Sequence, residues 1–113
     1  MTIESQIVSA CGPFLGGRIY PDIAPLEAGI PYAVYTRVSG QTIVALDGEV
    51  KANNARVQLA VWSTFRENSV ETMNELELLL VTAMKATPLG QISYEFSPVS
   101  KLYGSRKDFS FWW

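Results

Sequence analysis

The sequence contains no histidine, and this absence excludes several kinds of chemistry. Histidine is the most frequent general base in enzymes, and the Ser-His-Asp and Cys-His nucleophile systems depend on it. It is also the most frequent zinc ligand, and the single cysteine, Cys11, cannot build a structural zinc site without it. The glycine-rich stretch 12–17 lacks the lysine of a GxxxxGK phosphate loop and is interpreted as a helix stop and loop.

Cysteine, net charge and long apolar segments are also scarce. One cysteine excludes an internal disulfide, which suits a reducing cytosol, and Cys11 is interpreted as a buried apolar side chain. Nine Lys and Arg against eleven Asp and Glu give a net charge of −2, without the basic excess of non-specific nucleic-acid binding. There is no signal peptide, and no stretch approaches the ~18 apolar residues of a membrane span. The sequence predicts a soluble intracellular protein.

The clearest structural pattern lies between residues 54 and 86, where a strand precedes a long helix. Val57, Leu59 and Val61 alternate with their neighbours at the period of a strand. Helical spacing then places six apolar residues on one face, namely Val70, Met73, Leu76, Leu80, Ala83 and Met84.

The limits of this helix, about 65–86, are predicted from capping and helix-breaking residues. Two capping boxes are available for its start, Thr64 with Glu67 and Asn68 with Glu71. Pro88 and Gly90 are expected to stop it, because proline lacks a backbone donor and disfavours helix in the residue before it.

Shorter patterns occupy the rest of the chain. An apolar face predicts a short helix at 3–11, and the Pro- and Gly-rich stretch 12–29 is a long loop in which 18–21 pairs briefly. Alternation predicts four further strands, at 30–39, 42–46, 91–96 and 107–113.

Glycine, proline and acidic residues predict where these strands end. Gly40 breaks the strand 30–39, Ser97-Pro98 interrupts the strand 91–96, and Tyr103-Gly104-Ser105 is a turn. Carboxylate chemistry is not excluded, since Asp22, Asp47 and Glu49 are available acids. Asp47-Gly48, however, is more simply a hairpin turn.

The fold class follows from the order helix, three strands, helix, two strands. The 113 residues, 48% of them hydrophobic, fit a single domain, 1–113. Closely spaced sequential strands favour an antiparallel meander. The predicted class is α+β, a two-layer sandwich with a mainly antiparallel sheet of four to five strands, on which the helices at about 65–86 and 3–11 pack.

The chain resembles the phage tail completion or tail terminator proteins, the gp17-like, DUF3168-type group. The likeness rests on the order and spacing of three stretches along the chain. These stretches are Ile30-Pro31-Tyr32-Ala33-Val34-Tyr35, Arg56-Val57-Gln58-Leu59-Ala60-Val61-Trp62-Ser63 and the aromatic ending Asp108-Phe109-Ser110-Phe111-Trp112-Trp113. It covers most of the chain, from about residue 3 to the end.

The resemblance implies a non-enzymatic architectural protein without catalytic residues, cofactor or metal. Such a protein forms a ring, usually of six subunits, at the head-proximal end of a tail tube, stops tube polymerisation and presents a surface to the head connector. The implied partners are further copies of this chain, the tail tube protein and the head-tail connector, with DNA passing through the ring and no membrane. The implied location is the head-tail junction of the virion, after assembly in the host cytoplasm.

Candidate interface residues come from the sheet, because one helix layer covers only one of its faces. We expect Tyr35, Trp62 and Trp112 on the other face, in a subunit or tube contact, with Arg37 as a further candidate. The alternative is that the N-terminal helix or loop 12–29 covers these aromatics within the monomer, since large aromatics are more often core than interface. Further contacts are expected in loop 12–29 and in the segment 40–54.

Three basic residues, Lys101, Arg106 and Lys107, lie close together near the C-terminus. A contact with DNA in the tail is one interpretation. A solvated turn is the simpler one, and the neighbouring Asp108 weakens the case for DNA.

Two other functions are compatible with the sequence. One is an adaptor on the head side of the head-tail joint. The other is a small homodimeric α+β ligand-binding domain, or a small enzyme that uses carboxylates, because two-layer folds support many functions. This second hypothesis predicts a closed dimer with an enclosed apolar pocket, whereas the tail terminator hypothesis predicts an open ring.

Overall fold

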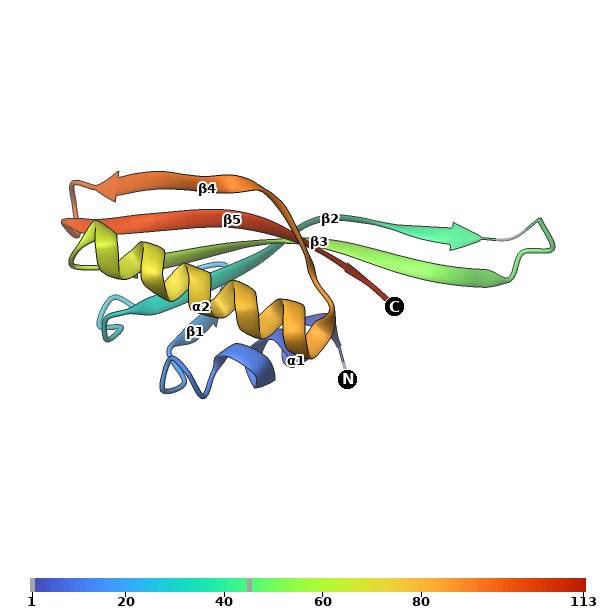
Figure 1. Cartoon of the computed structure of the whole chain (residues 1–113), viewed down its shortest axis with the longest axis horizontal. Helices are drawn as coiled ribbons and strands as arrows, with labels where there is room; N and C mark the ends of the chain where they lie inside the picture. Colours follow the sequence, from blue (N-terminus) through green and yellow to red (C-terminus); the bar gives the residue numbers. More distant parts are fainter. Residues whose placement is uncertain (1, 45) are drawn as a thin grey trace.

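The computed structural model describes residues 2–44 and 46–113, and it has the predicted α+β architecture (Figure 1). The elements in chain order are α1 (Ile3–Cys11), β1 (Ile19–Pro21), β2 (Tyr32–Val44), β3 (Val50–Ser63), α2 (Arg66–Met84), β4 (Thr87–Ser97) and β5 (Leu102–Trp112). The five strands form one sheet in the order β1-β2-β3-β5-β4, in which only the β1–β2 pair is parallel. Both helices lie on the same face of the sheet.

The core fills the space between the helices and this face of the sheet. The alternating residues Val57, Leu59 and Val61 are buried there, as the strand pattern predicts. They pack with side chains from β5 and both helices, among them Phe109, Phe111, Met73, Leu76, Leu80, Ile3, Ile7 and Cys11. Each large apolar side chain buried in this way contributes about 1.5–3 kcal/mol of transfer free energy.

Helix α2 occupies nearly the predicted range, but neither predicted capping box forms at its start. The N-cap residue is Phe65, which makes no side-chain cap hydrogen bond. At the other end, Lys85 adopts a left-handed conformation with φ 53°, and the Ala86 N–H donates to the Leu80 carbonyl at 3.3 Å. This turn ends the helix at Met84, four residues before Pro88.

Pro88 and Gly90 therefore belong to a strand and do not stop a helix. Strand β4 is longer than the predicted 91–96 and lies at the edge of the sheet, where a residue without an N–H is tolerated. Its register shifts between Leu89 and Ser93, and Gly90 within this shift has φ 73°.

The apolar face of α2 also differs in part from the prediction. Met73, Leu76 and Leu80 are buried, but Val70 is only half-buried and Ala83 is exposed. Two polar residues, Ser69 and Thr72, are buried in their place. The hydroxyl of Ser69 pairs with that of Ser105 in β5 at 2.8 Å, and so satisfies a polar group that the packing removes from water.

Strand β2 continues through Gly40 and joins the predicted strand 30–39 to residues 42–44 of the predicted strand 42–46. Residue 45 of that prediction lies outside the described residues. A Cβ at position 40 would clash with the Asn54 carbonyl oxygen, so glycine allows the close approach of β3. The register shifts just before it, between Arg37 and Ser39. The predicted turn at Asp47-Gly48 is confirmed, with Gly48 at φ 87° and Asp47 Oδ1 accepting from the Glu49 N–H.

The predicted turn at 103–105 is wrong, because these residues lie inside β5. The connection between β4 and β5 is the turn 98–101, with Lys101 at φ 57°. The brief pairing expected at 18–21 is confirmed as β1, which pairs in parallel with residues 33–35 of β2.

A long hairpin projects from one end of the molecule, which measures 53 × 24 × 24 Å (Figure 1). The last β5 residue to pair with β3 is Trp112, opposite Asn54, and the backbones of Trp113 and Asn53 exchange two more hydrogen bonds. Beyond that point β2 and β3 continue as a two-stranded ribbon. We call residues 41–44 and 46–52 the hairpin arm.

Candidate assembly surfaces

Trp62 lies on the face of the sheet that the helices leave uncovered, which we call the open face. It pairs with Tyr32 of β2 and Gly104 of β5. Its ring covers Gly104, since a Cβ at that position would lie 2.9 Å from the indole. Tyr32 in turn makes an edge-on contact with Tyr20 of β1, with ring centroids 6.2 Å apart. Trp62 is thereby half-buried within the monomer.

Ion pairs occupy the middle of the open face. Arg56 donates two hydrogen bonds to Asp108 Oδ2, at 2.8 and 2.6 Å. Arg106 pairs with both carboxylate oxygens of Glu95, at 2.8 and 2.9 Å. Because each guanidinium already has a carboxylate partner, this part of the sheet is a compensated polar surface.

The three basic residues near the C-terminus do not form one cluster. Arg106 points to the open face, whereas Lys107, the next residue of β5, forms an ion pair with Glu77 of α2 on the helix side. Lys101 is exposed in the turn before β5. The alternation of a strand separates the two β5 charges, so these three residues do not form one basic patch.

Tyr35 does not lie on the open face, and this part of the prediction is wrong. It pairs with Leu59, and paired residues of antiparallel strands share a face, so it packs on the helix-side core. Burial, followed by the charges of Glu4 and Asp22, raises the pKa of Tyr35 and keeps its phenol neutral.

Arg37 lies on the same side as Tyr35, against α1 and the C-terminus. Its Nη1 is 3.6 Å from Glu4 Oε1, and its guanidinium stacks 5.8 Å from the centre of the Trp113 ring. Thr2, Ile3 and Gln6 complete the lining of a cavity of about 310 Å³ beside these three residues. Arg37 thus ties α1 to the end of the sheet.

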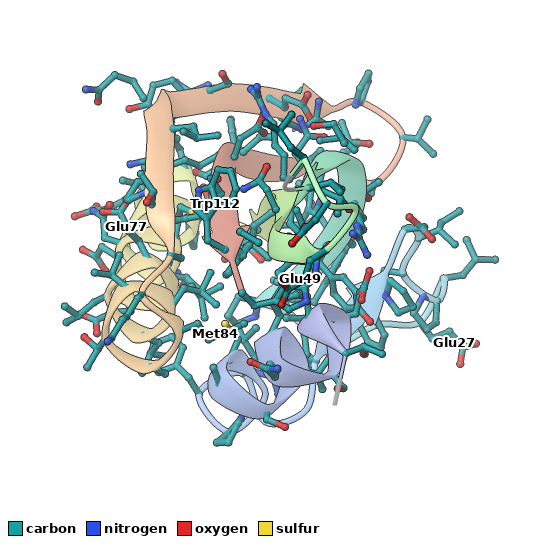
Figure 2. The ribbon with its side chains drawn as sticks, turned by 90° about the vertical axis from the view of Figure 1, so that its right-hand side faces the viewer. Glu27, Glu49, Glu77, Met84 and Trp112 are labelled. Carbon is teal, nitrogen blue, oxygen red and sulfur yellow. The ribbon has the colours of Figure 1, made fainter. Side chains whose placement is uncertain are left out.

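The aromatic ending of the chain is only partly inside the sheet, where the sequence analysis placed it. Phe109 and Phe111 are fully buried, but Trp112 and Trp113 are 48% and 52% exposed. Trp112 lies on the open face beside Asn54, at the root of the hairpin arm (Figure 2). It pairs eight positions along β3 from Trp62, a separation of roughly 27 Å. The two predicted tryptophans therefore share the open face but lie far apart on it.

A further aromatic cluster lies at the opposite end of the molecule from the hairpin arm (Figure 1). Arg66 at the start of α2 stacks between Tyr94 and Tyr103, at 5.6 and 5.3 Å from the ring centres. Phe96 packs on Tyr103 with a centroid separation of 4.9 Å, and Phe65 is adjacent in sequence to Arg66. We call these five residues the aromatic end.

The sequence analysis did not identify the aromatic end. Alternation predicts a strand that contains Tyr94 and Phe96, but the Tyr103-Gly104-Ser105 pattern predicts a turn at their neighbour Tyr103. The pairing of Phe96 with Tyr103 brings these rings together, and it becomes visible only when β5 starts at Leu102.

The described residues contain no group of three or more Cys, Asp or Glu side chains that could hold a metal ion. In the same part of the chain, no helix is long and apolar enough to cross a membrane. Cys11 is buried, and burial raises the pKa of its thiol to about 11.

Comparison with known protein families matches residues 8–97 to the tail completion protein gp17 family. The chain belongs to this family. The match runs from within α1 to the end of β4 and so includes the whole β2–β3 hairpin and α2, and it confirms the resemblance seen in the sequence. The tail completion family assigns the protein a structural role in phage tail assembly.

A solved structure has the same fold. It is a chain of the "Virion of native gene transfer agent (GTA) particle", with a TM-score of 0.56 and 9% sequence identity over 96% of this chain and 92% of that chain. At this identity the similarity shows the fold alone. No curated protein sequence matches the chain significantly.

Proposed function

We propose that this tail completion family member is a non-enzymatic, single-domain protein that caps the head-proximal end of a phage tail tube. In this role it assembles as a ring of six, stops tube polymerisation and joins the tail to the head connector. Its location is the head-tail junction of the virion, and DNA passes through the ring. Family membership over residues 8–97 is the observation that carries the proposal.

The shape of the subunit supports a ring. A ring needs two different, complementary patches on each subunit, because its contacts are heterologous. The chain is elongated, with the hairpin arm at one end and the aromatic end at the other (Figure 1). A chain of similar fold occurs in a gene transfer agent virion, which is compatible with a role in a particle.

The competing ligand-binding reading requires an enclosed apolar pocket. The cavity beside α2, of about 370 Å³, is instead lined by Phe14 and by four polar residues, Glu71, Thr72, Asn74 and Glu75. This cavity is open to solvent and is not the enclosed pocket that the ligand-binding hypothesis requires.

Electron microscopy of particles made after deletion of this gene tests the proposal. Overlong tail tubes detached from filled heads are expected, because an uncapped tube continues to polymerise. Tails of normal length that fail to attach would instead assign the protein to the head-side adaptor role. Intact, infectious particles would contradict any role in tail completion. Restoration by the wild-type gene supplied in trans is the control.

A further inference from the structure

The hairpin arm has less internal support than any other part of the sheet. Strand β1 pairs only with residues 33–35 of β2, and β5 reaches no further along β3 than residue 53, so the arm has two free edges. An isolated two-stranded hairpin is at best marginally stable in water. The arm nevertheless exposes Val44 and, at its tip, the entire side chain of Leu46.

The aromatic end has the composition of a protein-binding hot spot. Phe65, Tyr94 and Phe96 are 63%, 58% and 48% exposed, and Arg66 lies among them. Aromatic residues and arginine are enriched at the centres of interfaces, where they supply large contact areas at low entropy cost. Val99 in the adjoining turn is also almost fully exposed. This surface and the arm are the two ends of the long axis, so one copy cannot bring them together.

The tip of the arm and the aromatic end also differ in charge, although Lys51 lies further along the arm and Glu67 follows Arg66. The turn of the arm contains Asp47 and Glu49, and Glu49 stands at the end that faces the viewer in Figure 2. The aromatic end contains Arg66, with Lys101 in the neighbouring turn. Within the described residues, neither of these two cations forms an ion pair with a carboxylate. Opposite charges on two apolar patches favour one specific pairing of the patches.

We propose that the hairpin arm of one copy docks on the aromatic end of a second copy. Leu46 and Val44 pack against Tyr94 and Phe96, and the acidic turn meets Arg66 and Lys101. Each copy has one arm and one aromatic end, so the contact can repeat from copy to copy, and it builds the proposed ring when the rotation between neighbours closes. This inference rests on the proposed ring and assigns the surfaces that build it.

Disulfide trapping tests the pairing with the full-length protein. The double variant Leu46→Cys/Tyr94→Cys carries one thiol at each end of the molecule. Mild oxidation is expected to produce a ladder of linked oligomers on a non-reducing gel, up to the number of subunits in the ring. Leu46→Cys alone and Tyr94→Cys alone are expected to stay unlinked, because each thiol faces a different surface. The buried native Cys11 stays protonated and does not compete.

A matched control is Leu46→Cys/Leu26→Cys, since Leu26 is equally exposed but lies in the loop 12–29. It is expected to give no ladder. Native mass spectrometry of the same samples, at concentrations up to the millimolar range, tests the ring separately from the assigned contact. Rings without the ladder would overturn the assigned contact and leave the ring intact. Monomers at every concentration would overturn the ring and this contact with it, and dimers of the single variant Leu46→Cys would show an isologous contact instead.

Discussion

The indole of Trp62 occupies the space that a side chain at Gly104 would need, because a Cβ at position 104 would lie 2.9 Å from the ring. Replacement of Gly104 by alanine must therefore move the ring or the strand. We expect Gly104→Ala to lower the free energy of unfolding by about 1–3 kcal/mol, the usual cost of overpacking. Urea denaturation followed by fluorescence measures this. Ser93→Ala, at an exposed position of β4, is the control and is expected to change stability by less than about 0.5 kcal/mol. A Gly104→Ala variant with the free energy of unfolding of the wild type would mean that the Trp62 indole does not pack on Gly104.

Trp62 itself separates an intramolecular role from an interface role. Its packing on Gly104 and beside Tyr32 predicts that Trp62→Gln is destabilised by about 2–4 kcal/mol, somewhat below a fully buried Trp→Ala change because the ring is half-buried. Urea denaturation gives the free energy, and circular dichroism shows whether the variant is folded. A variant of wild-type stability that no longer assembles would instead make Trp62 an interface residue, as the hypothesis of a subunit or tube contact predicts.

The ion pair between Lys107 and Glu77 joins β5 to α2 in a partly buried position. We expect a double-mutant cycle with Lys107→Met and Glu77→Gln to give a coupling free energy of about 1–3 kcal/mol, since removal of one partner leaves the other charge poorly solvated. The more exposed pair Arg37 and Glu4 is the control and is expected to couple by less than about 1 kcal/mol. Equal coupling in both cycles would contradict the effect of burial.

The sequence predicts elements whose signal is local and misses those that depend on a partner strand. The alternation of Val57, Leu59 and Val61 and the helical spacing of Met73, Leu76 and Leu80 each bury one face without reference to other segments, and both are confirmed. The sequence predicts that Gly40 ends a strand and that Pro88 ends a helix, because glycine is conformationally permissive and proline lacks a backbone N–H. In the structure, Gly40 lies against the Asn54 carbonyl and Pro88 lies at a sheet edge. Both positions depend on how the strands pair, which the local sequence does not show.

Surfaces were harder to predict than elements for the same reason. Tyr35 and Trp62 are both aromatic strand residues, but the β2–β3 register places Tyr35 beside Leu59 and Trp62 beside Tyr32, on opposite faces. The aromatic end required the pairing of β4 with a longer β5. Register is a long-range property, and a shift of one residue exchanges the faces of a whole strand.

The thiol of Cys11 couples folding to alkaline pH. Burial raises its pKa from 9.0 to about 11, so the folded protein holds this proton at pH values where the unfolded chain has lost it. Its contribution is complete below pH 9 and is lost as the pH rises through 11, a loss of about 2–3 kcal/mol. Urea unfolding at pH 8 and pH 11 is expected to show a smaller drop for Cys11→Ala than for the wild type. The raised pKa values of Tyr32 and Tyr35 act in both proteins and cancel in the comparison. An equal decrease in the free energy of unfolding of both proteins between pH 8 and pH 11 would contradict the burial of the Cys11 thiol.

Mixing of two assembly-defective variants tests whether the ring contact joins unlike surfaces. Leu46→Glu changes only the exposed tip of the arm, and Phe96→Glu changes only the aromatic end. Leu46 is fully exposed, so Leu46→Glu is expected to change the free energy of unfolding by less than about 0.5 kcal/mol. Phe96 contacts Tyr103, so Phe96→Glu is expected to cost about 1 kcal/mol while the fold is retained.

Each variant alone is expected to remain monomeric at concentrations at which the wild type forms rings, as measured by light scattering after size exclusion. An equimolar mixture still contains one intact arm, on Phe96→Glu, and one intact aromatic end, on Leu46→Glu. Because no other intact pair exists, assembly must stop at a dimer of one copy of each variant. Native mass spectrometry distinguishes that species by mass. Rings in the mixture, or in either variant alone, would show that the subunits join through other surfaces.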